Sequence, residues 1–129
     1  MKASDFRRIA LGMTDAVEGA HMGHPDFRVH GRIFATLTED GMRGMVKLTP
    51  ERQQEFIDAN PRMFVPASGA WGRQGCTMVE LPFADETVIG EAMTLAWQET
   101  ANKGAVKRSG ARKAVQRSAR SSVRQSRRR

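Results

Sequence analysis

Acidic residues are missing from the last part of this chain. Residues 103–129 contain 11 Lys and Arg and no Asp or Glu, which is a net charge of +11. Residues 1–102 contain 10 Lys and Arg against 14 Asp and Glu, which is a net charge of −4. The pI near 10.7 is therefore a property of the final segment. Such a polycation favours a polyanion as its partner.

Cysteine and long apolar runs are also scarce. The one cysteine, Cys76, excludes an internal disulfide and fits a reducing compartment. The first residues lead into a charged amphipathic stretch, so we expect neither a signal peptide nor a membrane span. These features predict a soluble, cytoplasmic protein without a membrane partner.

The rest of the sequence suits one small domain followed by a tail. Roughly 100 residues can bury a modest core without disulfides or a structural metal. We place an α+β domain at residues 1–102 and a basic, disordered nucleic-acid-binding tail at residues 103–129. The apolar side chains of this tail are too few to offset the entropy of ordering it. A tail that becomes helical along phosphates stays an open alternative, because Lys113, Arg117, Arg120, Arg124 and Arg127 follow helical spacing.

Apolar periodicity and turn residues predict an α+β fold in the order α-β-β-β-α-β-β-α. The sheet is antiparallel, a meander plus two further strands, and helices pack on it. Thr49-Pro50-Glu51 is a strong helix start, and Gly104 is expected to end the last helix. Residues 23–26 are predicted to form a turn, and residues 66–75 a glycine-rich loop. The predicted elements are a helix at residues 4–16, strands at 27–30, 33–37 and 44–48, a helix at 49–60, strands at 63–65 and 76–81, and a helix at 85–102.

The candidate nucleic-acid-binding residues are cations and one tryptophan. Tail cations attract phosphates without distinguishing sequence. In the body, Arg28, Arg32, Arg43 and Arg73 are expected to add contacts, while Trp71 either stacks on a base or covers the core. We expect DNA as the partner, and the composition leaves RNA open. The predicted tail contacts are Lys103, Lys107, Arg108, Arg112, Lys113, Arg117, Arg120, Arg124, Arg127, Arg128 and Arg129.

Motifs for catalysis or for a metal do not stand out in the sequence. His21, His24, His30 and Cys76 lack the spacing of a ligand set, which favours histidines that only make hydrogen bonds. The glycine-rich segment at residues 68–75 lacks the ending of a P-loop. We therefore predict a protein that is not an enzyme and has no metal and no cofactor.

Three blocks of sequence resemble the MmcQ/YjbR family, and the resemblance covers about residues 4–101. The blocks are GHPDFRV at residues 23–29, GRIFATL at 31–37 and GAWGRQG at 69–75. The resemblance implies an α+β fold similar to secretion-chaperone-like folds, with a β-meander and helices. Members are commonly described as DNA-binding proteins with hairpin wings as contacts, so it implies a small DNA-binding protein. The chaperone-like fold also leaves open a protein-interaction module, with a homodimer as an open possibility and an incidental basic extension.

Overall fold

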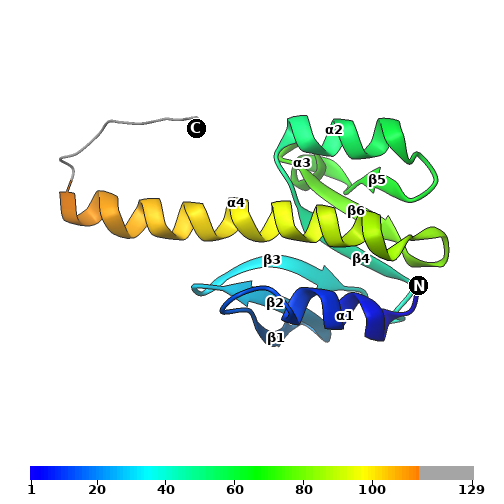
Figure 1. Cartoon of the computed structure of the whole chain (residues 1–129), viewed down its shortest axis with the longest axis horizontal. Helices are drawn as coiled ribbons and strands as arrows, with labels where there is room; N and C mark the ends of the chain where they lie inside the picture. Colours follow the sequence, from blue (N-terminus) through cyan, green and yellow to red (C-terminus); the bar gives the residue numbers. More distant parts are fainter. Residues whose placement is uncertain (114–129) are drawn as a thin grey trace.

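The computed structural model describes residues 1–113, with side-chain surroundings through residue 103. A six-stranded antiparallel sheet, in the order β1-β2-β3-β4-β6-β5, forms one layer and helices α1, α2 and α4 form the other (Figure 1). The predicted α+β class and element order are confirmed, and the structure adds strand β1 and the short helix α3. The elements are α1 (Ala3–Leu11), β1 (Val17–His21), β2 (His24–Val29), β3 (Arg32–Leu37), β4 (Arg43–Lys47), α2 (Pro50–Ala59), β5 (Phe64–Pro66), α3 (Gly69–Arg73), β6 (Cys76–Glu80), the 3-10 turn η1 (Leu81–Phe83) and α4 (Glu86–Lys113).

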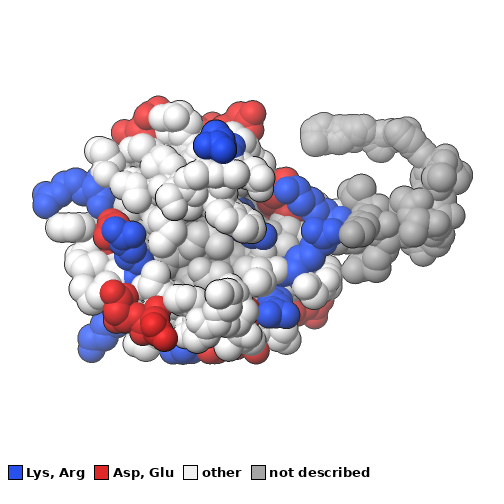
Figure 2. Space-filling view, turned by 180° about the vertical axis from the view of Figure 1, so that it is seen from behind, with Lys and Arg blue, Asp and Glu red and all other residues white. Residues whose placement is uncertain are grey.

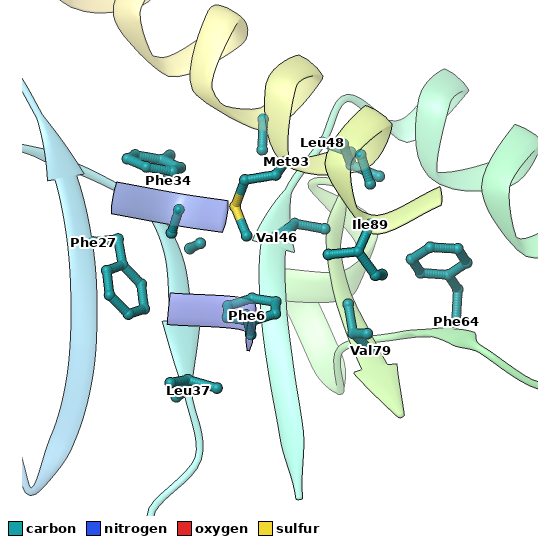
Figure 3. Close-up of a cluster of buried hydrophobic side chains, with 14 of the residues drawn as sticks. Phe6, Phe27, Phe34, Leu37, Val46, Leu48, Phe64, Val79, Ile89 and Met93 are labelled. Carbon is teal, nitrogen blue, oxygen red and sulfur yellow. The ribbon is translucent and has the colours of Figure 1, made fainter. Parts of the chain in front are cut away.

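The helices cover one face of the sheet. In Figure 1, α4 crosses in front of β4, with α1 on one side of it and α2 on the other. The core lies between α4 and the strands (Figure 3). Close approach of α1 requires glycine at position 44, because a Cβ there would lie 2.5 Å from the ring of Phe6. The largest core side chains are Phe6, Phe27, Phe34, Phe64, Leu81, Ile89 and Met93.

The first hairpin differs from the sequence prediction. The expected turn at residues 23–26 lies at Met22 and Gly23, whose φ angles are +52° and +81°. His24 instead begins β2, and the strand continues through Pro25 and beyond. Pro25 is tolerated there because pairing of β2 with β3 begins only at the next residue. Strand β1, which pairs with β2, was missed because its largely exposed residues show no apolar alternation.

The first helix is shorter than predicted. Gly12 caps α1, so the segment of residues 12–16 is not helical. The predicted start is close, since the Asp5 carboxylate accepts a hydrogen bond from the Lys2 backbone N–H at 2.9 Å. Gly12 ends these nine helical residues with a right-handed backbone conformation (φ −76°), and glycine is a poor helix former. Apolar residues after Gly12, such as Met13, continue the helical spacing in sequence. They pack against the core, although their backbone is not helical.

The second helix is confirmed, and the loop after it contains a further helix. Thr49 caps α2 by accepting a hydrogen bond from the Arg52 backbone N–H at 3.2 Å. The segment predicted as a loop at residues 66–75 contains α3. Its formation is explained by contacts from elsewhere in the chain, because the buried amide of Gln53 donates to the backbone oxygens of Gly72 and Cys76, each at 3.0 Å.

The last helix is longer than predicted. Asp85 caps α4 as expected, accepting from the Val88 backbone N–H at 3.0 Å. The expected end near Asn102, with Gly104 as the stop, is wrong, because α4 continues to Lys113. Ala, Lys and Arg dominate the residues that follow and favour helix, which outweighs the cost of the two interior glycines, Gly104 and Gly110. Residues 114–129 lie outside the described part of the chain. No helix within residues 1–113 is both long and apolar enough to cross a membrane.

Candidate nucleic-acid interface

Most arginines of the body are held in ion pairs with acidic side chains. Arg43, predicted to contact nucleic acid, pairs with Glu80 across strands β4 and β6 at 3.0 Å. Such pairs cancel the charge that a phosphate would meet. This explains why a body with ten Lys and Arg offers few candidate anion contacts. The arginines paired in this way are Arg7, Arg8, Arg28, Arg43 and Arg52.

Arg28 is the most strongly engaged of the predicted contacts. Its guanidinium donates to both carboxylate oxygens of Asp26, at 2.8 and 3.0 Å. The Asp26 carboxylate also contacts the His21 ring nitrogen Nδ1 at 2.8 Å, and its side chain is fully buried. The Arg28 hydrogen bonds lower the pKa of Asp26, burial opposes this, and the His21 contact lowers it further. Arg28 is therefore the partner of a buried acid.

The three histidines lie apart from any cluster of ligands. The ring centroids of His21 and His24 are 6.1 Å apart, and His30 contacts Asp15 at 3.6 Å. Cys76 lies on β6. Within residues 1–103, no three His, Cys, Asp or Glu side chains are placed to hold one metal ion.

Three cations from distant parts of the chain surround one small cavity, which we name the basic cavity. Arg32 begins β3, Lys47 ends β4, and Lys103 lies on α4. The cavity has a volume of about 130 Å³. The polar and aromatic residues that line it include Arg32, Lys47, Trp71, Gln74, Glu99, Thr100 and Lys103. The structure thus brings together predicted residues 32, 71 and 103 and adds Lys47, which no local motif marks.

The charge in the basic cavity is predominantly positive. Among the described residues that line the cavity, Glu99 is the only acid, and it lies 3.7 Å from Lys103, whose side chain is 65% exposed. Within the described residues, neither Arg32 nor Lys47 has an acidic partner within 4.0 Å. An exposed lysine pair contributes little free energy, so Lys103 can exchange Glu99 for another anion at low cost.

Trp71 stands between the basic cavity and a second, apolar depression. Its side chain is 63% exposed, so it is not a lid buried over the core. The second depression, which we name the apolar hollow, measures about 400 Å³ and is formed chiefly by Met45, Val65, Pro66, Trp71 and Met78, with Arg43 also in its lining. Figure 2 shows the face of the sheet that the helices leave uncovered, and its centre is largely free of charged side chains.

Local packing fixes the position of Trp71. Helix α3 approaches the preceding segment so closely that a Cβ on Gly72 would overlap the backbone oxygen of Ala67. The amide of Gln53 holds the same helix from the other side. Arg73 is exposed at the end of α3 and does not line either cavity.

Cys76 lines both cavities but is a poor nucleophile. It is buried, and burial raises the pKa of its thiol, while the ammonium groups of Lys47 and Lys103 act in the opposite direction to a smaller extent. A neutral, enclosed thiol is unreactive at neutral pH.

The cationic segment starts at the basic cavity. Lys107, Arg108, Arg112 and Lys113 all belong to α4, which runs past the edge of the sheet in Figure 1. From Lys103 to Lys113 the helix axis rises by about 15 Å. The other predicted tail contacts, Arg117, Arg120, Arg124, Arg127, Arg128 and Arg129, lie outside the described residues.

The YjbR family model matches residues 11–99 of this chain. The protein belongs to the YjbR family. A crystal structure of Deinococcus radiodurans protein DR2400, with the domain DUF419, shares the fold with a TM-score of 0.69. The two chains are 20% identical, and the alignment covers 92% of this chain and 91% of the other. No curated protein matches this chain. The family match ends before Lys103, so it covers most of the body but not the cationic segment.

Proposed function

We propose that this YjbR-family protein binds DNA largely without sequence specificity and that Lys and Arg side chains of residues 103–129 contact the phosphates. The observation that carries the proposal is the separation of charge along the chain. Arginines of the body are mostly paired with acids, whereas residues 103–129 contain no acid of their own. The basic cavity lies where the cationic segment begins, which extends the positive surface onto the body.

Counterion release gives the expected strength and its salt dependence. If six to eight cations meet phosphates, log affinity falls with log salt at a slope of about −5 to −7. Contacts of this kind hold DNA in place but do not distinguish base sequence. Affinity is therefore expected to be similar for unrelated duplexes of one length.

A salt titration of the full-length chain tests this proposal. Replacing the six arginines of residues 114–129 by glutamine keeps the chain length and removes six of the 11 positive charges of residues 103–129. The slope is expected to become shallower by up to about 5. Arg62→Gln is the control for the loss of one positive charge outside the cationic segment. Arg62 stacks over Phe83 at 4.6 Å, beside the beginning of α4, whereas the cationic segment lies at the end of that helix. A duplex affinity that is unchanged by salt, or by the six substitutions, contradicts the proposal. The substituted residues are Arg117, Arg120, Arg124, Arg127, Arg128 and Arg129.

A protein-interaction module is the second candidate function, and one groove favours it. The groove lies between α2 and α4, measures about 870 Å³, and includes Phe56, Val88 and Leu95 in its lining. Gly90 faces open space there, since a Cβ would meet nothing within 4 Å. If a second copy of the chain occupies this groove, Gly90→Arg converts a dimer into a monomer in light scattering. A wild-type chain that is monomeric at high concentration rules out this self-association.

A further inference from the structure

Trp71 separates two cavities of opposite chemistry. On one side lies the basic cavity, with Arg32, Lys47 and Lys103, and on the other the apolar hollow. Trp71 and Cys76 line both, and Cys76 is buried, so the exposed indole forms the dividing wall. A ligand at this wall would meet an aromatic surface, an apolar surface and cations together.

The apolar hollow has the size and lining of a small-molecule site. Its volume of about 400 Å³ falls within the roughly 300–1,000 Å³ of ligand pockets. Met45 and Met78 face each other across β4 and β6, and Val65 pairs with Met78 from β5. Methionine side chains adapt to flat aromatic groups, because they are flexible and polarisable.

The basic cavity supplies the positive charge that would bind a phosphate. Arg32 and Lys47 lack an acidic partner among the described residues, and the pair of Lys103 with Glu99 is long and exposed. Three cations against one acid among the described lining residues leave a net charge of about +2 around this small cavity of about 130 Å³. The two cavities therefore suit the two ends of one nucleotide.

We propose that this site binds one unpaired nucleotide of a single-stranded nucleic acid, with its base stacked on Trp71 over the apolar hollow and its phosphate in the basic cavity. The proposal rests on the proposed function and adds a preference for unpaired strands. A base inside a duplex cannot offer its face to Trp71, whereas every unpaired base has a face to stack. Sequence preference is therefore expected to stay weak.

Binding of labelled oligonucleotides by the full-length protein tests the site. The probes are oligothymidine and oligouridine of about 16 nucleotides, the upper end of common single-strand sites, and a duplex of equal length. Trp71→Ala is expected to weaken single-strand binding about tenfold or more while changing duplex affinity less than about twofold. Trp71→Phe, which keeps an aromatic face, retains most of the single-strand affinity. Oligothymidine and oligouridine separate DNA from RNA as the source of the strand.

Charge and fluorescence give two further measurements. Lys47→Gln is expected to reduce the salt slope for single strands by about 0.7, whereas the control Arg62→Gln does not reduce it. Oligothymidine is expected to quench tryptophan emission of the wild type. This quenching is expected to disappear in Trp71→Phe. That variant retains Trp97 as its tryptophan, and the Trp97 indole N–H donates to the Thr14 backbone oxygen at 2.9 Å.

The outcomes distinguish this inference from the proposed function. If the wild type binds duplex but Trp71→Ala leaves single-strand affinity unchanged, or lowers both affinities equally, the single-strand site is wrong and DNA binding stands. If the wild type binds neither strand form at low salt, the proposed function fails as well.

Discussion

Asp26 accepts two hydrogen bonds from the guanidinium of Arg28 while its own carboxylate is fully enclosed. Removing one partner from such a pair leaves a buried charge without compensation. The pair lies on β2, two residues apart on one face of the strand. This ion pair therefore joins two residues of the same strand. Because β2 belongs to the first hairpin, we expect the pair to act mainly on the stability of that hairpin.

Arg28→Ala is expected to destabilise the fold by about 2–3 kcal/mol. This is below the usual cost of a fully buried pair because the Arg28 side chain is 36% exposed. The matched control is Arg7→Ala, which breaks the half-exposed pair with Glu18 and should cost under about 1 kcal/mol. Urea unfolding of both variants measures the difference. Equal losses would mean that the burial of Asp26 does not matter.

The same pair gives a pH dependence of stability. Because the pKa of Asp26 is lowered in the folded state, its contribution is present above the unfolded pKa of about 3.9. This contribution is lost as the pH falls through the lower folded value. In urea unfolding, the stability difference between wild type and Asp26→Asn is therefore expected to shrink below about pH 4. A constant difference across that range would contradict a lowered pKa.

Two glycines are expected to respond oppositely to alanine. Gly44→Ala places a methyl group 2.5 Å from the Phe6 ring and should cost about 1–3 kcal/mol, because overpacking displaces the core. Gly90→Ala meets only open space on a helix and should stabilise by about 0.5–1 kcal/mol. Thermal unfolding of the two variants gives the sign of each change. A stabilising Gly44→Ala would show that α1 packs less closely than described.

Gln53 and Gln54 are a matched pair for testing how α3 is held. Gln53→Met keeps the side-chain size but removes both hydrogen bonds to Gly72 and Cys76, at a cost of about 2 kcal/mol. Gln54→Met removes an exposed bond to Asp58 and should change stability by less than about 0.5 kcal/mol. Chemical unfolding measures both costs, and Trp71 emission should change only with Gln53→Met. Indistinguishable variants would show that the buried amide does not position α3.

The thiol of Cys76 should be nearly inert in the folded protein. Burial raises the pKa of Cys76, and the side chain is only 6% exposed. A chromogenic disulfide reagent at neutral pH should label it slowly, and labelling should become complete in denaturant. Rapid labelling of the native chain would show that the wall between the two cavities opens.

Local signals in the sequence predicted the elements whose ends are set by local chemistry. Thr49-Pro50 marks the start of α2, and Asp85 marks the start of α4, because each cap satisfies backbone N–H groups beside it. The end of α4 was mispredicted at Gly104, where helix-favouring neighbours outweigh the glycine. Strand β1 was missed because pairing with β2, and not apolar alternation, holds it in the sheet.

The candidate site was predicted only in part for a different reason. Tryptophan and arginine are conspicuous in sequence, so residues 32 and 71 were selected, but nothing local shows that Lys47 and Lys103 lie near them. Their proximity depends on how β3, β4, α3 and α4 meet. The engagement of Arg28 by Asp26 was also missed, although residues two apart on a strand share a face.

The unbroken course of α4 through residue 103 has a geometrical consequence. Each helical residue advances the direction of a side chain by about 100°. Adding or removing a single residue between 104 and 113 would therefore swing the following backbone around the axis by that angle relative to Trp71. The number of residues in this stretch thus sets an orientation as well as a length.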